Sequence, residues 1–195
     1  MGSNESVIPE HWREIATVAK EPIGWPTWPE IVLPKPRPKT ASRNDLNTGA
    51  GNTTQIILPL ARLSGEGIEG ARIRITAWPF RRQFDVTATM EAPGGRSFVT
   101  IARLDAWPPD PHENVSRPHR QMLGVPAQVI GHHIHRFEDN ARVGREAFAP
   151  FGNLPIARPI EGPIDSFRQF LDMVGKEFRI EGLADWPPPE WGELI

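Results

Sequence analysis

Five of the six histidines in this 195-residue chain lie between positions 112 and 135. Three of them belong to the run His132-His133-Ile134-His135. Imidazole titrates near neutral pH and is the commonest protein ligand for transition metals. Side chains alternate between the two faces of a strand, so a strand over residues 128–137 places His133 and His135 side by side. The sequence therefore predicts a site built around this histidine pair.

The preceding predicted strand and the loop after it supply companions for the pair. Arg103 and Asp105 are two residues apart and share one face of that strand. If the two strands pair, both residues converge with the histidines. We therefore expect six candidate catalytic residues: Arg103, Asp105, His112, Asn114, His133 and His135.

Three chemistries fit this set of side chains. Two imidazoles with an arginine form a general acid and base for phosphodiester cleavage. Alternatively, His133 and His135 with His112 or Asp105 bind a divalent metal ion, and water completes the site. The third is ligand binding without chemistry. Against all three stands a structural interpretation, in which the histidines cap loops or lie on a solvated strand face.

Three short motifs resemble those of an uncharacterised family of small prokaryotic and phage domains. They are Arg103-Leu104-Asp105, Pro111-His112-Glu113-Asn114 and His133-Ile134-His135-Arg136-Phe137. The resemblance covers the chain from about residue 70 onward and implies matching positions at Arg103, Asp105, His112, Asn114, His133, His135 and Phe137. It implies a phage or host-defence setting but no particular reaction. The segment 140–148 departs from the family pattern, so a shared substrate does not follow.

The elements that must position these residues are mostly strands. Runs rich in β-branched residues, with a period of two, predict strands at 53–63, 71–78, 84–90, 97–104 and 128–137. Pro93-Gly94-Gly95 predicts a hairpin between the third and fourth of these runs, and residues 106–127 are predicted to be a loop. Apolar residues at spacings of three and four predict a helix over 164–178. The expected fold is α+β, a mainly antiparallel sheet with one C-terminal helix packed on it.

The first 52 residues differ in composition from the rest. Residues 9–20 have the pattern of a short amphipathic helix, and residues 21–51 are rich in proline and polar residues. We therefore expect residues 1–52 to be a helix with a Pro-rich linker or strap, and 53–195 a single domain. Residues 21–40 are either a spacer over the domain or a contact for a protein partner.

Bulk composition narrows the classes of function. The chain has no cysteine, so thiolate metal sites and disulfides are excluded. A formal net charge of −2 argues against a broadly basic surface for duplex nucleic acid. Neither a spanning segment nor a secretory leader is evident, which favours a cytoplasmic protein without a membrane partner.

Together these features favour a phosphodiesterase or nuclease that acts on nucleic acid or a nucleotide signal through the histidine-rich site. The expected cofactor is either none or a divalent metal bound by His112, His133 and His135. The alternative is a non-catalytic binding protein, such as a phage or host-defence inhibitor or sensor, that acts by protein–protein contact. Neither a phosphate-binding loop nor a dinucleotide fingerprint is present.

Overall fold

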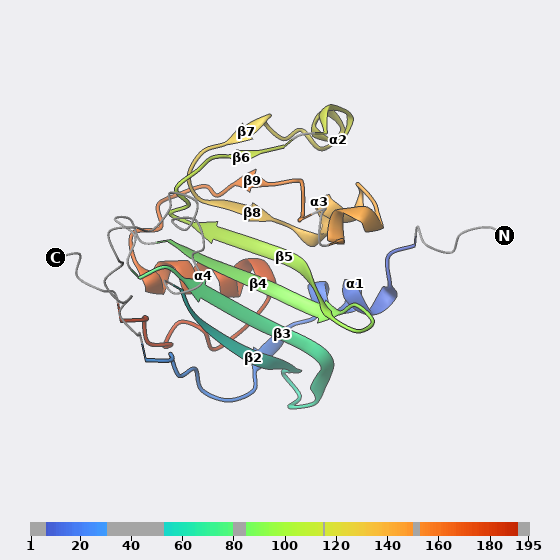
Figure 1. Ribbon diagram of the computed structural model, residues 1–195. Helices are drawn as coiled ribbons and strands as arrows, with labels where there is room; N and C mark the ends of the chain where they lie inside the picture. The colour runs from blue at the N-terminus through green and yellow to red at the C-terminus, as the bar shows by residue number, and fades with distance from the viewer. Residues whose placement is uncertain (1–6, 31–52, 80–84, 115, 150–152, 191–195) are drawn as a thin grey trace, which may run out of the picture.

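A seven-stranded antiparallel sheet forms the centre of the molecule (Figure 1). The computed structural model describes residues 7–30, 53–79, 85–114, 116–149 and 153–190. The order of the strands in the sheet is β1-β2-β3-β4-β5-β8-β9. The strands are β1 (Lys20–Pro22), β2 (Thr54–Arg62), β3 (Gly67–Ala77), β4 (Val86–Pro93), β5 (Phe98–Ala106), β8 (His133–His135) and β9 (Arg158–Pro159). The predicted α+β fold with a mainly antiparallel sheet is confirmed.

The first and the last helix pack on one face of this sheet. The helices are α1 (Glu10–Thr17), α2 (Arg117–Leu123), α3 (Phe137–Ala141) and α4 (Phe167–Phe178), with a 3-10 turn η2 (Arg145–Phe148). In Figure 1, α4 lies behind the central strands. It buries Phe170, Leu171 and Val174 in a single core with Ile73 and Ile75 of β3. The predicted C-terminal helix is therefore present, and its N-cap is Ser166, which accepts a hydrogen bond from the Gln169 amide at 3.2 Å.

The N-terminal segment joins the same core and the same sheet. Helix α1 buries Trp12 and Ile15 in the main cluster, and β1 pairs with β2. Farther along, the Trp28 indole N–H donates to the Pro187 carbonyl at 2.8 Å. Glu21 and Pro22 are thus part of the sheet, and the segment after them contacts the domain through Trp28. The rest of the proposed partner segment, residues 31–40, lies outside the described residues.

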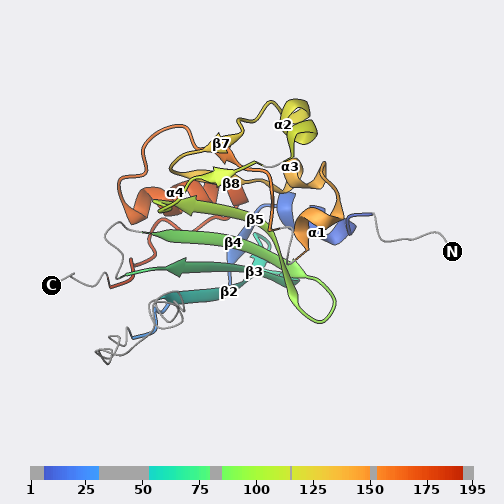
Figure 2. The same cartoon turned by 45° about the horizontal axis from the view of Figure 1, so that its top comes forward.

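Two local predictions around the histidines are wrong. The predicted loop at 106–127 contains a short strand, β6 (His112–Glu113), as well as helix α2. The predicted strand at 128–137 is two strands, because β7 (Gln128–Val129) pairs with β6 in a separate two-stranded sheet. Between β7 and β8, Gly131 adopts φ +77°, a left-handed conformation that ends extended backbone and that side chains disfavour. Figure 2 shows α2 and β7 beyond β8, at the same end of the molecule.

No helix in the described part of the chain has both the length and the apolar character needed to span a membrane.

Candidate metal centre

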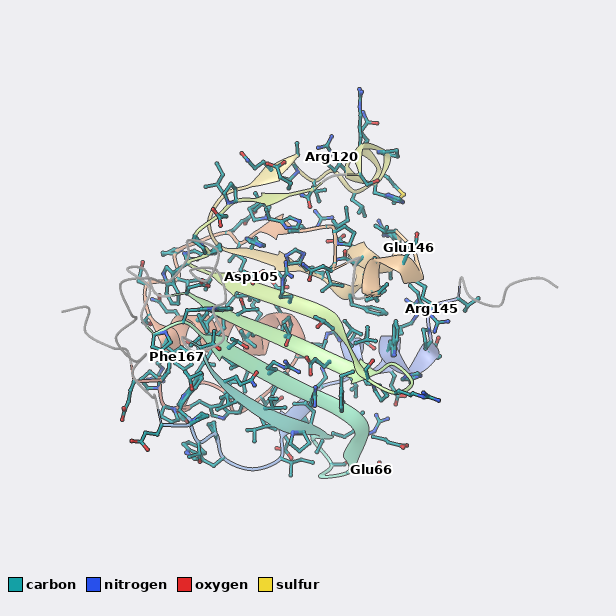
Figure 3. The ribbon with its side chains drawn as sticks, viewed as in Figure 1. Glu66, Asp105, Arg120, Arg145, Glu146 and Phe167 are labelled. Atoms are coloured by element: carbon teal, nitrogen blue, oxygen red, sulfur yellow. The ribbon has the colours of Figure 1, made fainter. Side chains whose placement is uncertain are left out.

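The pairing of β5 with β8 brings four predicted site residues together. The antiparallel register places Arg103 opposite His135 and Asp105 opposite His133. All four side chains lie on the sheet face away from Leu104 and Ile134, which are in the core. His133 and His135 are 3% and 0% exposed. Figure 3 labels Asp105 on β5, beside β8.

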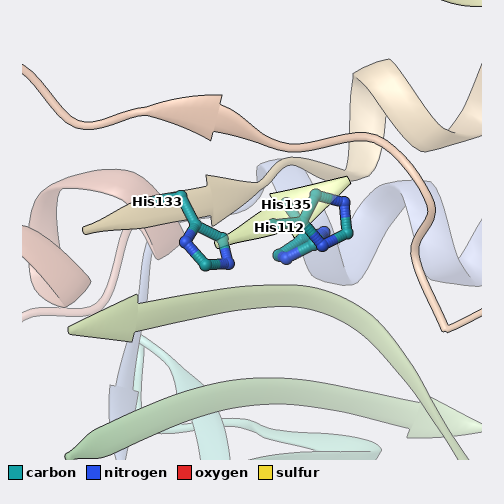
Figure 4. A group of neighbouring side chains, drawn as sticks. All are labelled: His112, His133 and His135. Carbon is teal, nitrogen blue, oxygen red and sulfur yellow. The ribbon is translucent and has the colours of Figure 1, made fainter. Parts of the chain in front are cut away.

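Strand β6 supplies the third imidazole, His112. Its ring centroid lies 5.4 Å from that of His133 and 4.6 Å from that of His135. One ring nitrogen from each of the three histidines lies within 4.8 Å of the others. Figure 4 shows the three rings grouped beside β8. We call His112, His133 and His135 the histidine triad.

Each triad imidazole uses one ring nitrogen to bond a backbone carbonyl. The three contacts are His133 Nδ1 to Gly131 O (2.8 Å), His135 Nδ1 to Leu154 O (2.6 Å) and His112 Nε2 to Pro155 O (3.2 Å). A carbonyl oxygen only accepts, so the bonded nitrogen must carry the hydrogen. In the neutral rings the other nitrogen therefore keeps its lone pair. It is Nε2 in His133 and His135, and Nδ1 in His112.

The lone pairs of His133 and His135 face a carboxylate. Asp105 Oδ2 lies 3.2 Å from His133 Nε2 and 3.4 Å from His135 Nε2. Two acceptors at this distance repel each other unless a positive charge lies on or between them. For His135 the Arg103 guanidinium supplies a donor, with Nη2 2.6 Å from Nε2. For His133, a cation bound between its Nε2 and the carboxylate would supply that charge.

Burial keeps two of the imidazoles neutral, whereas the neighbouring side chains keep the carboxylate ionised. Burial lowers the pKa of His135 to about 3, although the Asp105 carboxylate opposes that shift. Burial also lowers the pKa of His112, against a hydrogen bond to Pro155 that raises it. For Asp105, burial raises the pKa, but the contacts with the two histidines and the charge of Arg103 outweigh it and hold that pKa well below its usual value. Neutral imidazoles and an ionised carboxylate are the forms that bind metal.

Asn114, predicted as a site residue, bonds only to backbone in this structure. It is fully buried, and its amide donates to the Pro126 and Ala157 carbonyls at 2.8 and 2.9 Å. Its side-chain oxygen accepts from the Ala157 amide at 2.7 Å. Asn114 therefore anchors the end of β6, which carries His112, to the segment beside the triad.

Sequence reasoning missed Asn140. Its side chain bonds the backbone of Ile156 in the same way as the Asn114 side chain bonds the backbone of Ala157. The Asn140 side chain is also fully buried, donates to the Ile156 carbonyl at 3.0 Å and accepts from the Ile156 amide at 3.0 Å. The two asparagines thus hold the segment 154–157, whose Leu154 and Pro155 carbonyls orient two of the imidazoles. The Asn-Ala pattern at 140–141 contains no signal for this role, because its partner is distant in sequence.

Two further residues complete the site and were also missed. The Thr87 hydroxyl donates to Asp105 Oδ1 at 2.6 Å. Arg103 Nη1 donates to the Asn153 side-chain oxygen at 2.8 Å. Asn153 and Leu154 have φ values of 46° and 51°, which are unusual for residues with a Cβ and direct the Leu154 carbonyl at His135.

The remaining histidines lie apart from the triad. His132 Nδ1 accepts from the Trp107 amide at 3.0 Å, and His119 Nδ1 bonds the Ser116 hydroxyl at 2.6 Å. His11, in α1, contacts the Pro93 carbonyl. These three side chains have local structural partners.

No protein-family model, curated protein or solved structure matches this chain. The resemblance of its motifs to an uncharacterised prokaryotic and phage family therefore stays a prediction.

Proposed function

We propose that this chain is a metal-dependent phosphodiesterase or nuclease whose divalent ion is held by the histidine triad. One observation carries the proposal. Each imidazole has one nitrogen bonded to a backbone carbonyl, while one nitrogen of each ring lies within 4.8 Å of the others. Metal-binding histidines almost always have such an outer partner, which fixes the tautomer and the ring orientation.

The donor set fits zinc or a similar ion. Two nitrogens bound to one tetrahedral Zn²⁺ lie about 3.3 Å apart, given Zn–N bonds of about 2 Å. The triad nitrogens, within 4.8 Å of one another, reach that spacing by small movements of the side chains. Three histidines leave a fourth position open, as in catalytic zinc sites. An ion held there would activate water and polarise a phosphoryl oxygen.

The alternative of a metal-free acid–base pair fits the environment of His135 less well. A general acid or base works best when its pKa is near the working pH. Burial lowers the pKa of His135 to about 3, and its ring is fully buried. A neutral, immobile imidazole is suited to metal binding rather than to proton transfer.

Arg103 supports an anionic substrate. Its guanidinium lies within the site, in contact with both Asp105 and His135, and arginine matches the geometry of phosphate oxygens. We propose that this guanidinium would contact the phosphodiester of the substrate, in nucleic acid or in a nucleotide signal.

The test compares the wild-type chain with His133→Ala and His135→Ala variants. Each protein is stripped with a chelator, reloaded with Zn²⁺ or Mn²⁺, and assayed on bis(p-nitrophenyl) phosphate, single-stranded RNA and DNA, and cyclic nucleotides. We expect wild-type hydrolysis that depends on metal, and a loss of about 100-fold or more in both variants. The matched control is His119→Ala, which removes an imidazole outside the triad and should keep full activity.

The outcomes separate the candidate functions. Metal bound by the triad without hydrolysis of any substrate would indicate a structural metal site. Absence of both metal binding and hydrolysis would overturn the proposal and favour the non-catalytic binding protein. Equal activity in wild-type and triad variants would show that the histidines are not the catalytic site.

A further inference from the structure

Arg103 uses all three of its guanidinium nitrogens within the site. Nε donates to Asp105 Oδ2 at 2.8 Å, and Nη1 donates to the Asn153 side chain at 2.8 Å. Nη2 lies 2.6 Å from His135 Nε2. The Arg103 side chain is only 17% exposed, so these contacts are largely shielded from water. A guanidinium ion therefore sits where the imidazoles and the carboxylate converge.

The nitrogen that Arg103 contacts is also the nitrogen that a metal ion needs. His135 Nδ1 donates to the Leu154 carbonyl, so Nε2 carries the only lone pair of the neutral ring. One lone pair cannot serve both an N–H donor and a metal. In addition, two cations that share the ligands Asp105 and His135 repel each other strongly in a shielded site.

We propose that Arg103 and the divalent ion are alternative partners of His135, so that Arg103 sets the metal affinity of the site. This inference rests on the proposed metal centre. Without metal, the guanidinium neutralises Asp105 and satisfies His135. When metal binds, Nη2 leaves His135, and its N–H groups become available to an anionic substrate beside the ion. Arg103 is thus both a competitor for the ion and a donor to the substrate.

The competition makes an unusual prediction, because removing a residue of the site should strengthen metal binding. We would measure the Zn²⁺ dissociation constant by competition with a chromophoric chelator in full-length wild-type, Arg103→Met and Arg72→Met proteins. Arg103→Met should bind Zn²⁺ about 10-fold tighter or more. Arg72→Met is the matched control, since Arg72 pairs with Glu91 on β3 and β4, away from the triad, and its affinity should equal that of wild type.

A second measurement observes the displacement directly in the wild-type chain, so it does not depend on whether Arg103→Met folds. In the wild-type chain, one equivalent of Zn²⁺ should change the NMR signals of the Arg103 Nη groups and of His135 Nε2. His133→Ala should show no such change at one equivalent.

The results distinguish this inference from the proposed function. If wild type binds Zn²⁺ but Arg103→Met binds it equally or more weakly, the competition is wrong and the metal centre stands. If Arg103→Met does not fold, unchanged Arg103 signals on zinc binding to wild type overturn the competition. If neither wild type nor Arg103→Met binds Zn²⁺, the proposed metal centre fails and the competition fails with it.

Discussion

Asp105 contacts Arg103, Thr87 and both strand histidines of the site. Its two oxygens accept from Thr87 and Arg103 and face both strand histidines. The side chain is 13% exposed, so its charge interacts with little screening from water. This carboxylate therefore has two roles, as counterion of Arg103 and as candidate ligand or partner of the bound ion.

Asp105→Asn should impair both stability and metal binding. Breaking a shielded ion pair leaves the Arg103 charge uncompensated, which costs about 3–5 kcal/mol of unfolding free energy. The Zn²⁺ affinity should fall by about 10- to 100-fold, since a partner of the ligands is lost. Urea unfolding in chelator and zinc competition measure the two effects.

Glu10→Gln provides the comparison at this scale. It removes the carboxylate from the pair Arg13–Glu10 in α1, in which the side chains are 52% and 88% exposed. Exposed pairs contribute at most about 1 kcal/mol. Equal losses of stability in Asp105→Asn and Glu10→Gln would contradict the shielded role of Asp105.

At the scale of elements, the segment 154–157 organises the site without contributing a side chain to it. Its Leu154 and Pro155 carbonyls orient His135 and His112, while Asn140 and Asn114 bond the next two residues. A segment held by buried amides has little freedom to rotate its carbonyls. The triad is therefore arranged before any ligand arrives.

A buried lysine joins β1 to the end of α4. Lys20 is fully buried, and its Nζ donates to the Phe178 carbonyl at 2.6 Å. Burial, together with the charge of Arg179, lowers the pKa of Lys20 to about 7. The unfolded chain binds this proton up to a pH of about 10.5, so between pH 7 and 10.5 it holds more proton than the folded chain. Stability contributed at this position therefore rises with pH across that window.

Lys20→Met tests this linkage. The difference in unfolding free energy between wild type and Lys20→Met should shift in favour of wild type by about 1 kcal/mol per pH unit from pH 7 to 10. Urea titrations at several pH values measure it, and other titrating groups cancel in the difference. Lys176→Met, which changes an exposed lysine on α4, should show no such trend. A flat difference for Lys20→Met would refute the lowered pKa.

For the whole molecule, one core extends from α1 through the sheet to α4. Trp12, Leu104, Ile134 and Phe170 all belong to it. The proposed metal centre lies on the opposite side of β5 and β8 from this core, so the strands that carry His133 and His135 are part of the cooperative unit. A ligand that binds only the folded chain should then stabilise the entire domain.

Zinc should accordingly raise the thermal midpoint of the whole protein. At a free Zn²⁺ concentration 100 times Kd, the stabilisation is about 2.7 kcal/mol, or roughly 5–10 °C for a protein of this size. Calorimetry with Zn²⁺ and with chelator measures the shift. His119→Ala should keep it and His133→Ala should lose it. The same shift in both variants would place zinc binding outside the triad.

Local pattern was enough to predict much of the fold and part of the site. The alternation of residues in β3 and β5, the Pro93-Gly94 hairpin and the apolar face of α4 are short-range signals. Strand periodicity also predicted that Arg103 and Asp105 share a face, as His133 and His135 do. It did not predict that β7 and β8 belong to different sheets, because the turn at Gly131 depends on which strands each one pairs with.

The sequence by itself determined the residue types, the antiparallel α+β class and the histidine pair on one strand face, because these follow from the period of two. Only the tertiary structure decided which nitrogen of each imidazole keeps its lone pair. That choice depends on the carbonyls of Gly131, Leu154 and Pro155, whose directions are set by left-handed backbone and by bonds from Asn114 and Asn140. These contacts join residues far apart in the chain, and no local pattern encodes them.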